Sequence, residues 1–410
     1  MNVKITPQTL KGVINAPPSK SFAHRLLISA FLSGKKVSVL GLGTSSDVIT
    51  TLNALKGLGA VVTEIDGGVT IERKNLPSEK VVLNMNDSGS SLRFLMPVVS
   101  ALGLNVEFIG TERLLNRPIS ELVTSLNEHG AKIEGHTVNG KIEGGVYKIN
   151  GGVSSQYITG LMLALSVLGG EIIIEGELVS KPYIDITLSV LKDFGVSVIE
   201  SENRYIIKKG YNLTKTEFFV EGDWSGASFM LVAGALGGPV TVKGLNARSV
   251  QGDSEIIDII KKVGGKATIN GSEITVEKDK LNGIEVNIEN IPDLSQIIAV
   301  LLAFAKGTSK ITGVSRLKGK ESDRISAIVD MLNGSGVKCE YINNQITISG
   351  GVPTSFKADG NSDHRTVMSN AILASYAQGG SEITGAQAHV KSYPEFFNDF
   401  MALGGEYVDI

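Results

Sequence analysis

Long cationic side chains recur at the predicted starts of apolar helices, and this is the feature of the sequence that most directly suggests chemistry. A helix N-terminus presents unpaired backbone N–H groups and a partial positive charge, so phosphates and carboxylates bind there. Several such starts facing one site would hold small molecules with several negative charges. The cations at these positions are Lys20, Arg25, Arg93, Lys320, Arg324 and Arg365.

The spacing of these cations predicts which side chains share a helix face. Ser21 and Arg25 are four residues apart, as are Lys320 and Arg324, so each pair is expected on one face. Arg117 precedes a proline that suits the first position of a helix, which would place Arg117 at a helix mouth. Taken singly, such residues also suit a solvated helix with a surface ion pair worth less than about 1 kcal/mol.

Uncharged donors and further polar residues occupy comparable positions. The run Ser154-Ser155-Gln156 offers hydroxyl and amide groups, which complement a phosphate beyond its salt bridges but also suit a plain helix cap. Asp363-His364-Arg365 is open to the same two interpretations, and Lys391 precedes the last predicted helix. Because all these residues fall at equivalent positions of a repeat, we favour a binding site.

The repeat is visible in two series that run in phase along the chain. Apolar, helix-period segments end at Gly59, Gly130, Gly195, Gly264, Gly336 and Gly404, at intervals of 71, 65, 69, 72 and 68 residues. Small polar or acidic residues precede a second set of apolar helices at Ser19, Asp87, Ser154, Asp223, Asp293 and Asp363, at intervals of 68, 67, 69, 70 and 70 residues.

Each unit of about 70 residues therefore reads as a strand, a capped helix, a strand, a second helix and two strands. Six units predict an α/β (α+β) protein of two domains, each a pseudo-threefold repeat. A sixfold repeat of this kind could also build a ring around DNA, so the architecture alone does not assign a function.

Composition narrows these alternatives. The 410 residues are 42% hydrophobic, which suits two folded domains, and no apolar run approaches the 18 to 20 residues that cross a bilayer. The N-terminus lacks the pattern of a signal peptide, so we expect a cytoplasmic protein. A net charge of −3 and apolar helices such as 297–305 argue against a DNA-encircling ring. The single cysteine, Cys339, lies in an alternating, strand-like segment.

Taken in order, the motifs closely resemble the 5-enolpyruvylshikimate-3-phosphate synthase family over essentially the whole chain. The most specific segments are Ser180 to Thr187 and Lys320 to Arg324. The other segments that carry the resemblance are Ser19-Lys20-Ser21 with Arg25, Asp87-Ser88-Gly89-Ser90 with Arg93, Arg117-Pro118, Ser154-Ser155-Gln156, Glu221-Gly222-Asp223, Gln251-Gly252-Asp253, Ile291-Pro292-Asp293, Asp363-His364-Arg365 and Lys391.

The resemblance implies a two-domain inside-out α/β barrel. One domain would comprise residues 20–220 and the other residues 1–19 with 221–410, with the active site in the cleft between them. The implied activity is transfer of the enolpyruvyl group of phosphoenolpyruvate to the 5-hydroxyl of shikimate 3-phosphate, on the shikimate pathway to chorismate and the aromatic amino acids. The family resemblance further implies a monomer that needs no cofactor and no metal. The net charge of −3 and the short apolar runs predict that the protein binds neither nucleic acid nor membrane.

The resemblance also implies two ligand sets. The residues expected to bind shikimate 3-phosphate are Lys20, Ser21, Arg25, Ser154, Ser155, Gln156, Ser180, Asp293 and Lys320. The residues expected to bind phosphoenolpyruvate are Lys20, Gly89, Arg117, Gln156, Arg324, Arg365 and Lys391.

For the chemistry, Asp293 would accept the proton of the attacking hydroxyl, and Glu321 would protonate the methylene carbon of phosphoenolpyruvate. Lys20 and His364 would assist these transfers or stabilise developing charge. Two positions depart from the family pattern. Asp87 stands where asparagine is frequent, with a role as a helix cap open to it. Arg316 occupies a place where some members use asparagine near the shikimate phosphate, and its role as a ligand stays open.

The nearest alternative enzyme is the sister transferase that moves enolpyruvyl to UDP-N-acetylglucosamine. That enzyme has a Lys-Asn pair near its N-terminus and a cysteine in a loop. This chain has Lys20-Ser21 instead, and its only cysteine is the strand-like Cys339. The motifs therefore favour the shikimate enzyme.

Overall fold

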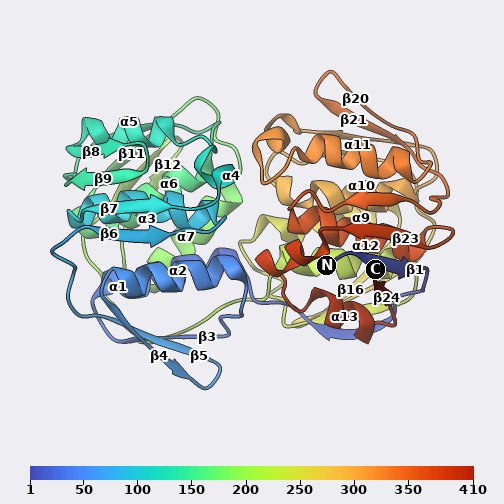
Figure 1. Ribbon diagram of the computed structural model, residues 1–410, viewed down its shortest axis with the longest axis horizontal. Helices are drawn as coiled ribbons and strands as arrows, with labels where there is room; N and C mark the ends of the chain where they lie inside the picture. Colours follow the sequence, from blue (N-terminus) through green and yellow to red (C-terminus); the bar gives the residue numbers. More distant parts are fainter. The chain divides into compact units, whose positions relative to one another are not determined.

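The computed structural model describes residues 1–410, and the chain divides into two compact units. The N-terminal unit comprises residues 20–220, and the C-terminal unit comprises residues 1–19 together with residues 221–410. Figure 1 shows both ends of the chain in the C-terminal unit, where the first and last strands pair.

The N-terminal unit contains three successive repeats of the predicted strand and helix order. Its elements are α1 (Lys20–Ser33), β3 (Val37–Leu40), α2 (Ser46–Gly57), β4 (Ala60–Ile65), β5 (Gly68–Arg73), β6 (Val81–Asn84), α3 (Gly89–Leu102), β7 (Val106–Ile109), α4 (Glu112–Leu115), α5 (Ser120–Glu128), β8 (Ala131–Glu134), β9 (Thr137–Gly140), β10 (Val146–Asn150), α6 (Ser155–Leu168), β11 (Gly170–Glu175), α7 (Lys181–Asp193), β12 (Val198–Ser201), β13 (Arg204–Ile207) and β14 (Glu217–Phe219).

The C-terminal unit repeats this order and adds four short 3₁₀ helices, η1 to η4. Its elements are β1 (Val3–Thr6), β2 (Gly12–Asn15), α8 (Trp224–Leu236), β15 (Val240–Lys243), η1 (Gly252–Glu255), α9 (Ile256–Val263), β16 (Lys266–Asn270), β17 (Glu273–Glu277), β18 (Glu285–Asn287), η2 (Pro292–Leu294), α10 (Ser295–Ala303), β19 (Thr308–Thr312), η3 (Ser315–Gly319), α11 (Arg324–Gly334), β20 (Cys339–Ile342), β21 (Gln345–Ser349), β22 (Lys357–Asp359), α12 (His364–Tyr376), β23 (Ser381–Thr384), η4 (Ala386–Lys391), α13 (Phe396–Ala402) and β24 (Glu406–Asp409).

Each of the six sheets has four strands, and the order is the same in all of them. Within a repeat, the strands lie side by side in the order first, second, fourth, third. The first pair is parallel and the others are antiparallel, as in β6-β7-β9-β8. Three strands join a sheet from a distant part of the sequence: β14 pairs with β3, β2 pairs with β15, and β1 lies between β23 and β24. The predicted sixfold α/β repeat is therefore confirmed.

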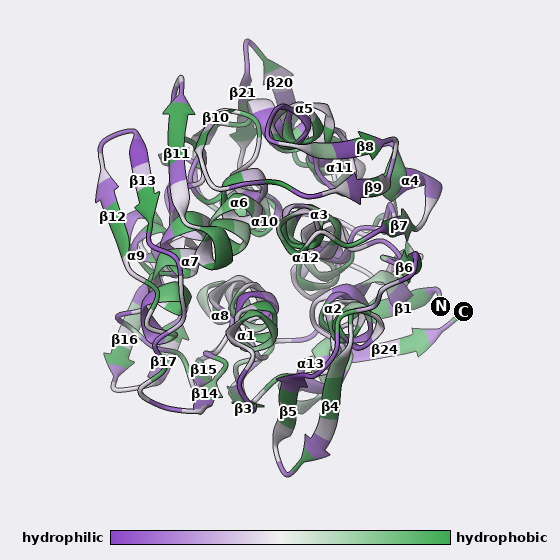
Figure 2. Ribbon diagram, turned by 90° about the vertical axis from the view of Figure 1, so that its left-hand side faces the viewer, coloured by the Kyte–Doolittle hydropathy of each residue, from purple (hydrophilic) through white to green (hydrophobic).

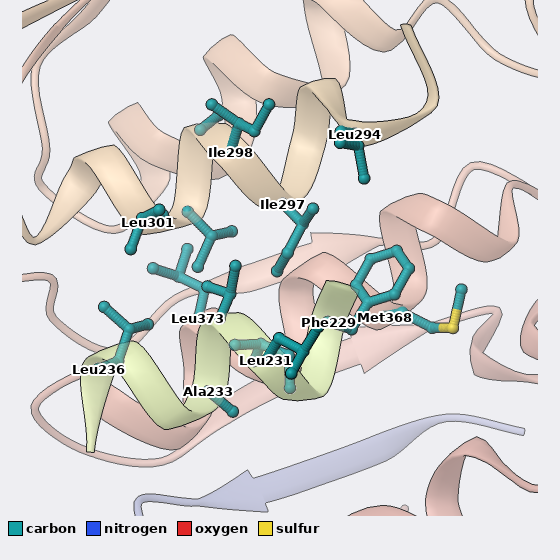
Figure 3. Close-up of a cluster of buried hydrophobic side chains, with 14 of the residues drawn as sticks. Phe229, Leu231, Ala233, Leu236, Leu294, Ile297, Ile298, Leu301, Met368 and Leu373 are labelled. Atoms are coloured by element: carbon teal, nitrogen blue, oxygen red, sulfur yellow. The ribbon is translucent and has the colours of Figure 1, made fainter. Parts of the chain in front are cut away.

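Apolar helices fill the inside of each unit and the strands lie outside them (Figure 2). Helix α8 is buried along its whole length because its residues are apolar or small on every side, which is the pattern of an internal helix. In Figure 3, Phe229 of α8 and Ile297 of α10 lie in one apolar cluster with Met368 of α12. No helix is both long enough and apolar enough to cross a membrane.

Helix starts differ in part from the prediction. The side chains of Ser154, Asp223 and Asp363 cap α6, α8 and α12, as the repeat predicted. In α3, however, Ser88 is the cap rather than Asp87, because its hydroxyl accepts the N–H of Ser91. Asp293 makes no cap either, since it lies within the turn η2 just before α10.

Two predicted helix positions are also wrong. Lys320 and Arg324 do not share a helix face, because α11 begins only at Arg324 and Lys320 follows the turn η3. Pro118 is not the first residue of a helix, since α5 begins at Ser120 after the N-cap Ile119. In both places a bend in the chain, not helical periodicity, positions the basic side chain.

Candidate active site

The C-terminal unit brings three cations onto one carboxylate, that of Asp293. Arg324 donates from Nη1 to Oδ1 at 2.8 Å, and Lys320 Nζ lies 3.4 Å from the same oxygen. Arg365 donates from Nη2 to Oδ2 at 3.0 Å. Asp293 comes from η2, Lys320 from the segment after η3, and Arg365 from the first turn of α12, so the starts of neighbouring repeats converge here.

Arg324 joins this carboxylate to two others. Its Nε donates to Oδ2 of Asp363 at 3.0 Å, and its Nη2 donates to Oε2 of Glu321 at 2.8 Å. The Arg324 side chain is only 1% exposed, so these contacts are made away from bulk water. Burial alone would lower the pKa of Arg324, but Asp363, Glu321 and Asp293 outweigh burial and raise that pKa.

The same charges determine the protonation of Asp293. Burial alone would raise the pKa of this carboxyl group, but Arg365, Lys320 and Arg324 outweigh burial and hold the pKa well below its usual range. Burial lowers the pKa of Lys320, against the attraction of Asp293. Asp293 is therefore a carboxylate at neutral pH, which is the form that can accept a proton.

The start of α12 completes this cluster. The Asp363 carboxylate accepts the N–H of Arg365 at 2.9 Å as the helix cap and also accepts the Ser322 hydroxyl at 3.0 Å. Arg365 Nη1 donates to the hydroxyl of Ser225 at 2.5 Å. His364 is 1% exposed, and its Nδ1 lies 3.6 Å from Asp363 Oδ1. Lys391, at the end of η4, is buried within the same unit.

Asp253 adds a buried carboxyl group next to these charges. Burial is the largest effect that raises the pKa of Asp253, and the charge of Asp293 raises this pKa further. The result is a pKa of about 7, against the opposing effects of Arg365 and Ser225. Its side chain belongs to η1, whose segment Gln251-Gly252-Asp253 carried part of the family resemblance without a predicted role.

Asp253 should make the C-terminal unit less stable as pH rises. In the unfolded chain this group ionises near 3.8, whereas in the folded unit it keeps its proton to about 7. The folded unit thus binds the extra proton between these values, and its stability falls by up to about 4 kcal/mol across that window. Asparagine at position 253 cannot ionise. The free energy of unfolding of the wild type should therefore fall relative to that of Asp253→Asn as pH rises from 4 to 7.

Urea unfolding followed by fluorescence measures this effect, because the only tryptophan, Trp224, is buried in the same unit. Asp330→Asn, at an exposed position of α11, is the control and should leave the pH dependence unchanged. A constant difference between Asp253→Asn and wild type from pH 4.5 to pH 7.5 would show that Asp253 does not titrate in this way.

The N-terminal unit carries its own cationic cluster, at the starts of α1, α3 and α6. Lys20 Nζ forms an ion pair with Asp47 Oδ2 at 2.8 Å, with both side chains largely buried. Sequence reasoning missed Asp47, which lies in the first turn of α2 and resembles an ordinary acidic residue near a helix start.

Arg25 is buried without a carboxylate partner. Its guanidinium donates to the hydroxyls of Thr187 and Thr159, at 2.8 and 3.2 Å, and to the carbonyl oxygens of Ser21 and Tyr183, at 2.7 and 2.9 Å. Burial lowers the pKa of Arg25 to about 9, so the group remains a cation at neutral pH. A buried cation held only by neutral groups is an effective partner for a bound anion.

The polar residues of α6 connect to α3. Gln156 accepts from Arg93 Nη1 at 2.7 Å through Oε1 and donates to the Ser90 hydroxyl at 3.0 Å through Nε2. Ser154 accepts the N–H of Gln156 as the cap of α6, and Ser155 is buried beside it. Ser180 precedes α7 with a left-handed backbone, at φ 55° and ψ 38°.

The start of α3 lies against Arg117. A Cβ atom on Gly89 would stand 2.4 Å from Arg117 Nη1, so only glycine allows this close approach. Asp87 is not the helix cap but accepts hydrogen bonds from Arg113, including one from Nε at 3.2 Å, and from the Thr111 hydroxyl at 2.9 Å. Asp87, which departs from the family pattern, is therefore neutralised by Arg113.

The structure thus brings predicted residues together within each unit: Asp293, Lys320, Glu321, Arg324 and Arg365 in the C-terminal unit, and Ser21 with Arg25 and Gly89 with Arg117 in the N-terminal unit. Sequence reasoning missed four residues that each contact a predicted residue from a separate element: Asp47, Thr159, Thr187 and Ser225. It also missed the role of Asp253, whose pKa responds to the charges of Asp293 and Arg365. Arg316 lies in η3, close enough to Lys320 for its charge to affect the pKa of that lysine. The chain contains no group of three or more His, Cys, Asp or Glu side chains that could hold a metal ion.

Comparison with solved structures places the fold among the enolpyruvyl transferases. The enolpyruvyl transferase NikO from Streptomyces tendae is 14% identical with a TM-score of 0.78 over 99% of this chain and 98% of its own. EPSP synthase from Acinetobacter baumannii is 24% identical with a TM-score of 0.83 over 100% of both chains. At these identities the likeness concerns the fold.

Sequence comparison is more specific. Residues 5–400 match the family EPSP synthase (3-phosphoshikimate 1-carboxyvinyltransferase), and the chain belongs to that family. Proteins named 3-phosphoshikimate 1-carboxyvinyltransferase from Clostridium kluyveri and Methanocorpusculum labreanum are 37% and 35% identical, over 98% and 99% of this chain and 97% and 99% of their own length. The resemblance inferred from the motifs is thereby confirmed.

Proposed function

We propose that this enzyme transfers the enolpyruvyl (1-carboxyvinyl) group of phosphoenolpyruvate to the 5-hydroxyl of shikimate 3-phosphate and releases phosphate. Family membership over residues 5–400 is the observation that carries this proposal. The relatives' shared name specifies the reaction, and no comparison favours transfer to UDP-N-acetylglucosamine or a DNA-encircling ring.

Shikimate 3-phosphate would bind through Arg25 and the donors at the start of α6. Arg25 has no carboxylate to neutralise it, and the adjacent helix start adds hydroxyl and N–H donors to its charge. The complete proposed set is Lys20, Ser21, Arg25, Ser154, Ser155, Gln156, Ser180, Asp293 and Lys320.

Phosphoenolpyruvate would bind through cations of both units. Guanidinium groups suit its carboxylate and phosphate because they can donate two parallel hydrogen bonds. The complete proposed set is Lys20, Gly89, Arg117, Gln156, Arg324, Arg365 and Lys391. Since each unit supplies only part of either set, we propose that residues 20–220 and the rest of the chain bind the same two substrates between them.

Two carboxyl groups would move the protons. Asp293 accepts the proton of the 5-hydroxyl as the hydroxyl oxygen bonds to C2 of phosphoenolpyruvate. Glu321 takes up a proton from water as the substrates bind, donates it to C3 and converts the methylene to a methyl group. The resulting intermediate has a tetrahedral C2. Glu321 then removes a proton from that methyl group, the bond from C2 to the phosphate oxygen breaks, and phosphate leaves with the proton from Asp293.

Arg324 lies between these two groups, donating to Asp293 and Glu321 at 2.8 Å each. Substrate anions would compete with the carboxylates for Arg324, Arg365 and Lys320. Because these cations lower the pKa of Asp293, sharing them with a substrate would raise that pKa. Asp293 would then be a stronger base with substrates bound than without them. Lys20 and His364 would stabilise charge or relay protons.

The proposal is tested by phosphate release from purified protein given shikimate 3-phosphate and phosphoenolpyruvate, with each omitted in turn and metal chelated throughout. Release that requires both substrates supports the proposal. Absence of release from folded protein, or release with UDP-N-acetylglucosamine in place of shikimate 3-phosphate, would contradict it. We further propose a cytoplasmic monomer, which sedimentation of the purified protein and cell fractionation would check.

Gly89→Ala should weaken phosphoenolpyruvate binding with little loss of stability. The new methyl group displaces the Arg117 guanidinium, which is the flexible end of a side chain and can move away from α3. We expect the KM for phosphoenolpyruvate to rise about 10-fold, as for the loss of one charged hydrogen bond of about 1.5 kcal/mol or more. Steady-state kinetics with each substrate varied would measure it.

The KM for shikimate 3-phosphate serves as an internal reference and should change less than about twofold. Gly145→Ala, in the same unit, is the matched control, because its backbone is not left-handed and an added Cβ would meet His129 Cδ2 only at 3.5 Å, an ordinary van der Waals contact. Equal increases in both KM values would argue that the substitution disturbs the whole unit rather than Arg117.

A further inference from the structure

A cavity of about 590 Å³ lies in the N-terminal unit, away from the residues assigned to catalysis. Its apolar surface comes from the last turns of α3 and α6, at Ala101, Leu102, Val167 and Leu168, together with Leu76. Its polar lining comprises Arg73, Lys74, Lys141 and Lys209 with Asn75, and includes no acidic residue.

Three of these cations lie over the C-terminal ends of the three inner helices. Glycines follow α1, α3 and α6, and the position of an added Cβ on each shows which cation is adjacent. Gly34 would meet Arg73 Nη2 at 3.2 Å, Gly103 would meet Lys141 Cδ at 3.1 Å, and Gly169 would meet Lys209 Cβ at 3.4 Å. The threefold repeat thus builds a ring of cations around an apolar floor.

Most of this positive charge is not neutralised by the protein. Lys74 forms an ion pair with Glu72 at 2.5 Å, but Arg73, Lys141 and Lys209 have no carboxylate partner. The three helix ends contribute about half a negative charge each, or about 1.5 charges in total. Three cations exceed that amount, so the cavity keeps an excess of positive charge.

The C-terminal unit shows that the fold does not require this ring. Lys141 and Lys209 are each followed by a residue whose backbone N–H donates to a carbonyl oxygen in the last turn of an inner helix. Ile142 donates to the carbonyl of Ser100 in α3, and Gly210 donates to the carbonyl of Ser166 in α6. In the C-terminal unit, the corresponding N–H groups belong to Gly351 and Gln8. They donate to the carbonyl oxygens of Ala303 and Ser375, in the last turns of α10 and α12. The residues equivalent to the two lysines are therefore Gly350 and Pro7.

Aromatic residues occupy that end of the C-terminal unit instead. The rings of Phe304 and Tyr376 pack edge to face at 6.2 Å, and the Tyr376 hydroxyl donates to the carbonyl of Ala233 at 2.8 Å. A Cβ on Gly350 would stand 1.8 Å from the carbonyl oxygen of Ala305, which leaves no room for a lysine. Stabilisation of helix ends alone therefore does not account for the cations of the N-terminal unit.

We propose that this cavity is a second ligand site, which binds a small organic anion with an apolar ring and at least two negatively charged groups. The apolar floor would bury one face of the ring, while Arg73, Lys141 and Lys209 would pair with the charges at its edge. The volume lies within the range of small-molecule sites in proteins.

Isothermal titration with naphthalene-2,6-dicarboxylate at low salt tests the site on the full-length protein. We expect binding that the double variant Lys141→Met/Lys209→Met weakens at least about 10-fold, since two charged contacts are lost. Val167→Trp, which fills the apolar floor and leaves the charge unchanged, should weaken binding by a similar factor. Inorganic phosphate, which lacks the apolar ring, should bind at least about 10-fold more weakly than the dicarboxylate.

The matched control is Lys338→Met/Lys357→Met, which removes two exposed lysines from the C-terminal unit and equals the test variant in net charge. Its affinity should stay within about twofold of the wild type, and saturating shikimate 3-phosphate should not displace the probe. Equal weakening by both double variants, displacement by shikimate 3-phosphate, or no binding at millimolar probe would each overturn the proposal.

Discussion

Asp293→Asn should lower the turnover number by about 10²- to 10⁴-fold, which is the usual contribution of a general acid or base. Asparagine keeps the size of the side chain and can still accept a hydrogen bond from Arg324, but it cannot take the proton of the attacking hydroxyl. The KM values should change much less than turnover, because Arg25 and the donors of α6 remain in place. Phosphate release under saturating substrates measures the effect.

Glu321→Gln is the companion variant, and it should reduce turnover by a comparable factor through the loss of proton transfer to C3. Asp330→Asn, at an exposed position of α11, serves as the control and should retain full activity. Trp224 fluorescence would verify that each variant folds. Near-normal turnover in both Asp293→Asn and Glu321→Gln would refute the assignment of these two groups.

Arg324→Met should have the largest effect on stability. The substitution leaves the carboxylates of Asp293, Glu321 and Asp363 without the cation that they share. Removing one partner of a buried ion pair costs about 3 to 5 kcal/mol, since the remaining charge is buried without compensation. Urea unfolding followed at Trp224 would measure this loss in the unit that contains the substitution.

Lys338→Met breaks an exposed ion pair with Glu340 in the same unit and should cost less than about 1 kcal/mol. An Arg324→Met variant as stable as Lys338→Met at pH 7 would mean that the three carboxylates do not depend on Arg324.

The ion pairs around Asp293 also bear on the anion binding that we propose for this site. The protein's own carboxylates neutralise Arg324, Arg365 and Lys320. With the proposed assignment, a phosphate or carboxylate of a substrate would therefore replace a contact rather than enter an unbalanced cluster of cations. Under the proposed function, this exchange would couple substrate binding to the basicity of Asp293.

Some of this arrangement could be predicted from the sequence because it is local and periodic. The sixfold repeat appears in the chain as regularly spaced glycines and helix starts, and each repeat needs only its own residues to specify its helices. Helix starts with an adjacent cation likewise show in short segments, such as Ser19 to Arg25. Errors arose where a bend replaced a helix, as at Lys320 and Pro118, since periodicity does not reveal turns.

The contacts that define the candidate site depended on the tertiary structure. Arg365 meets Asp293 across 72 residues of chain and Ser225 across 140, and Asp253 and Asp47 approach their cations from separate elements. Such pairs leave no mark on local spacing, because each residue is compatible with an ordinary cap or surface charge where it stands. The sequence by itself determined the repeats and the kinds of side chain at their helix starts, whereas packing of the repeats decided which of those charges meet and which remain available for a ligand.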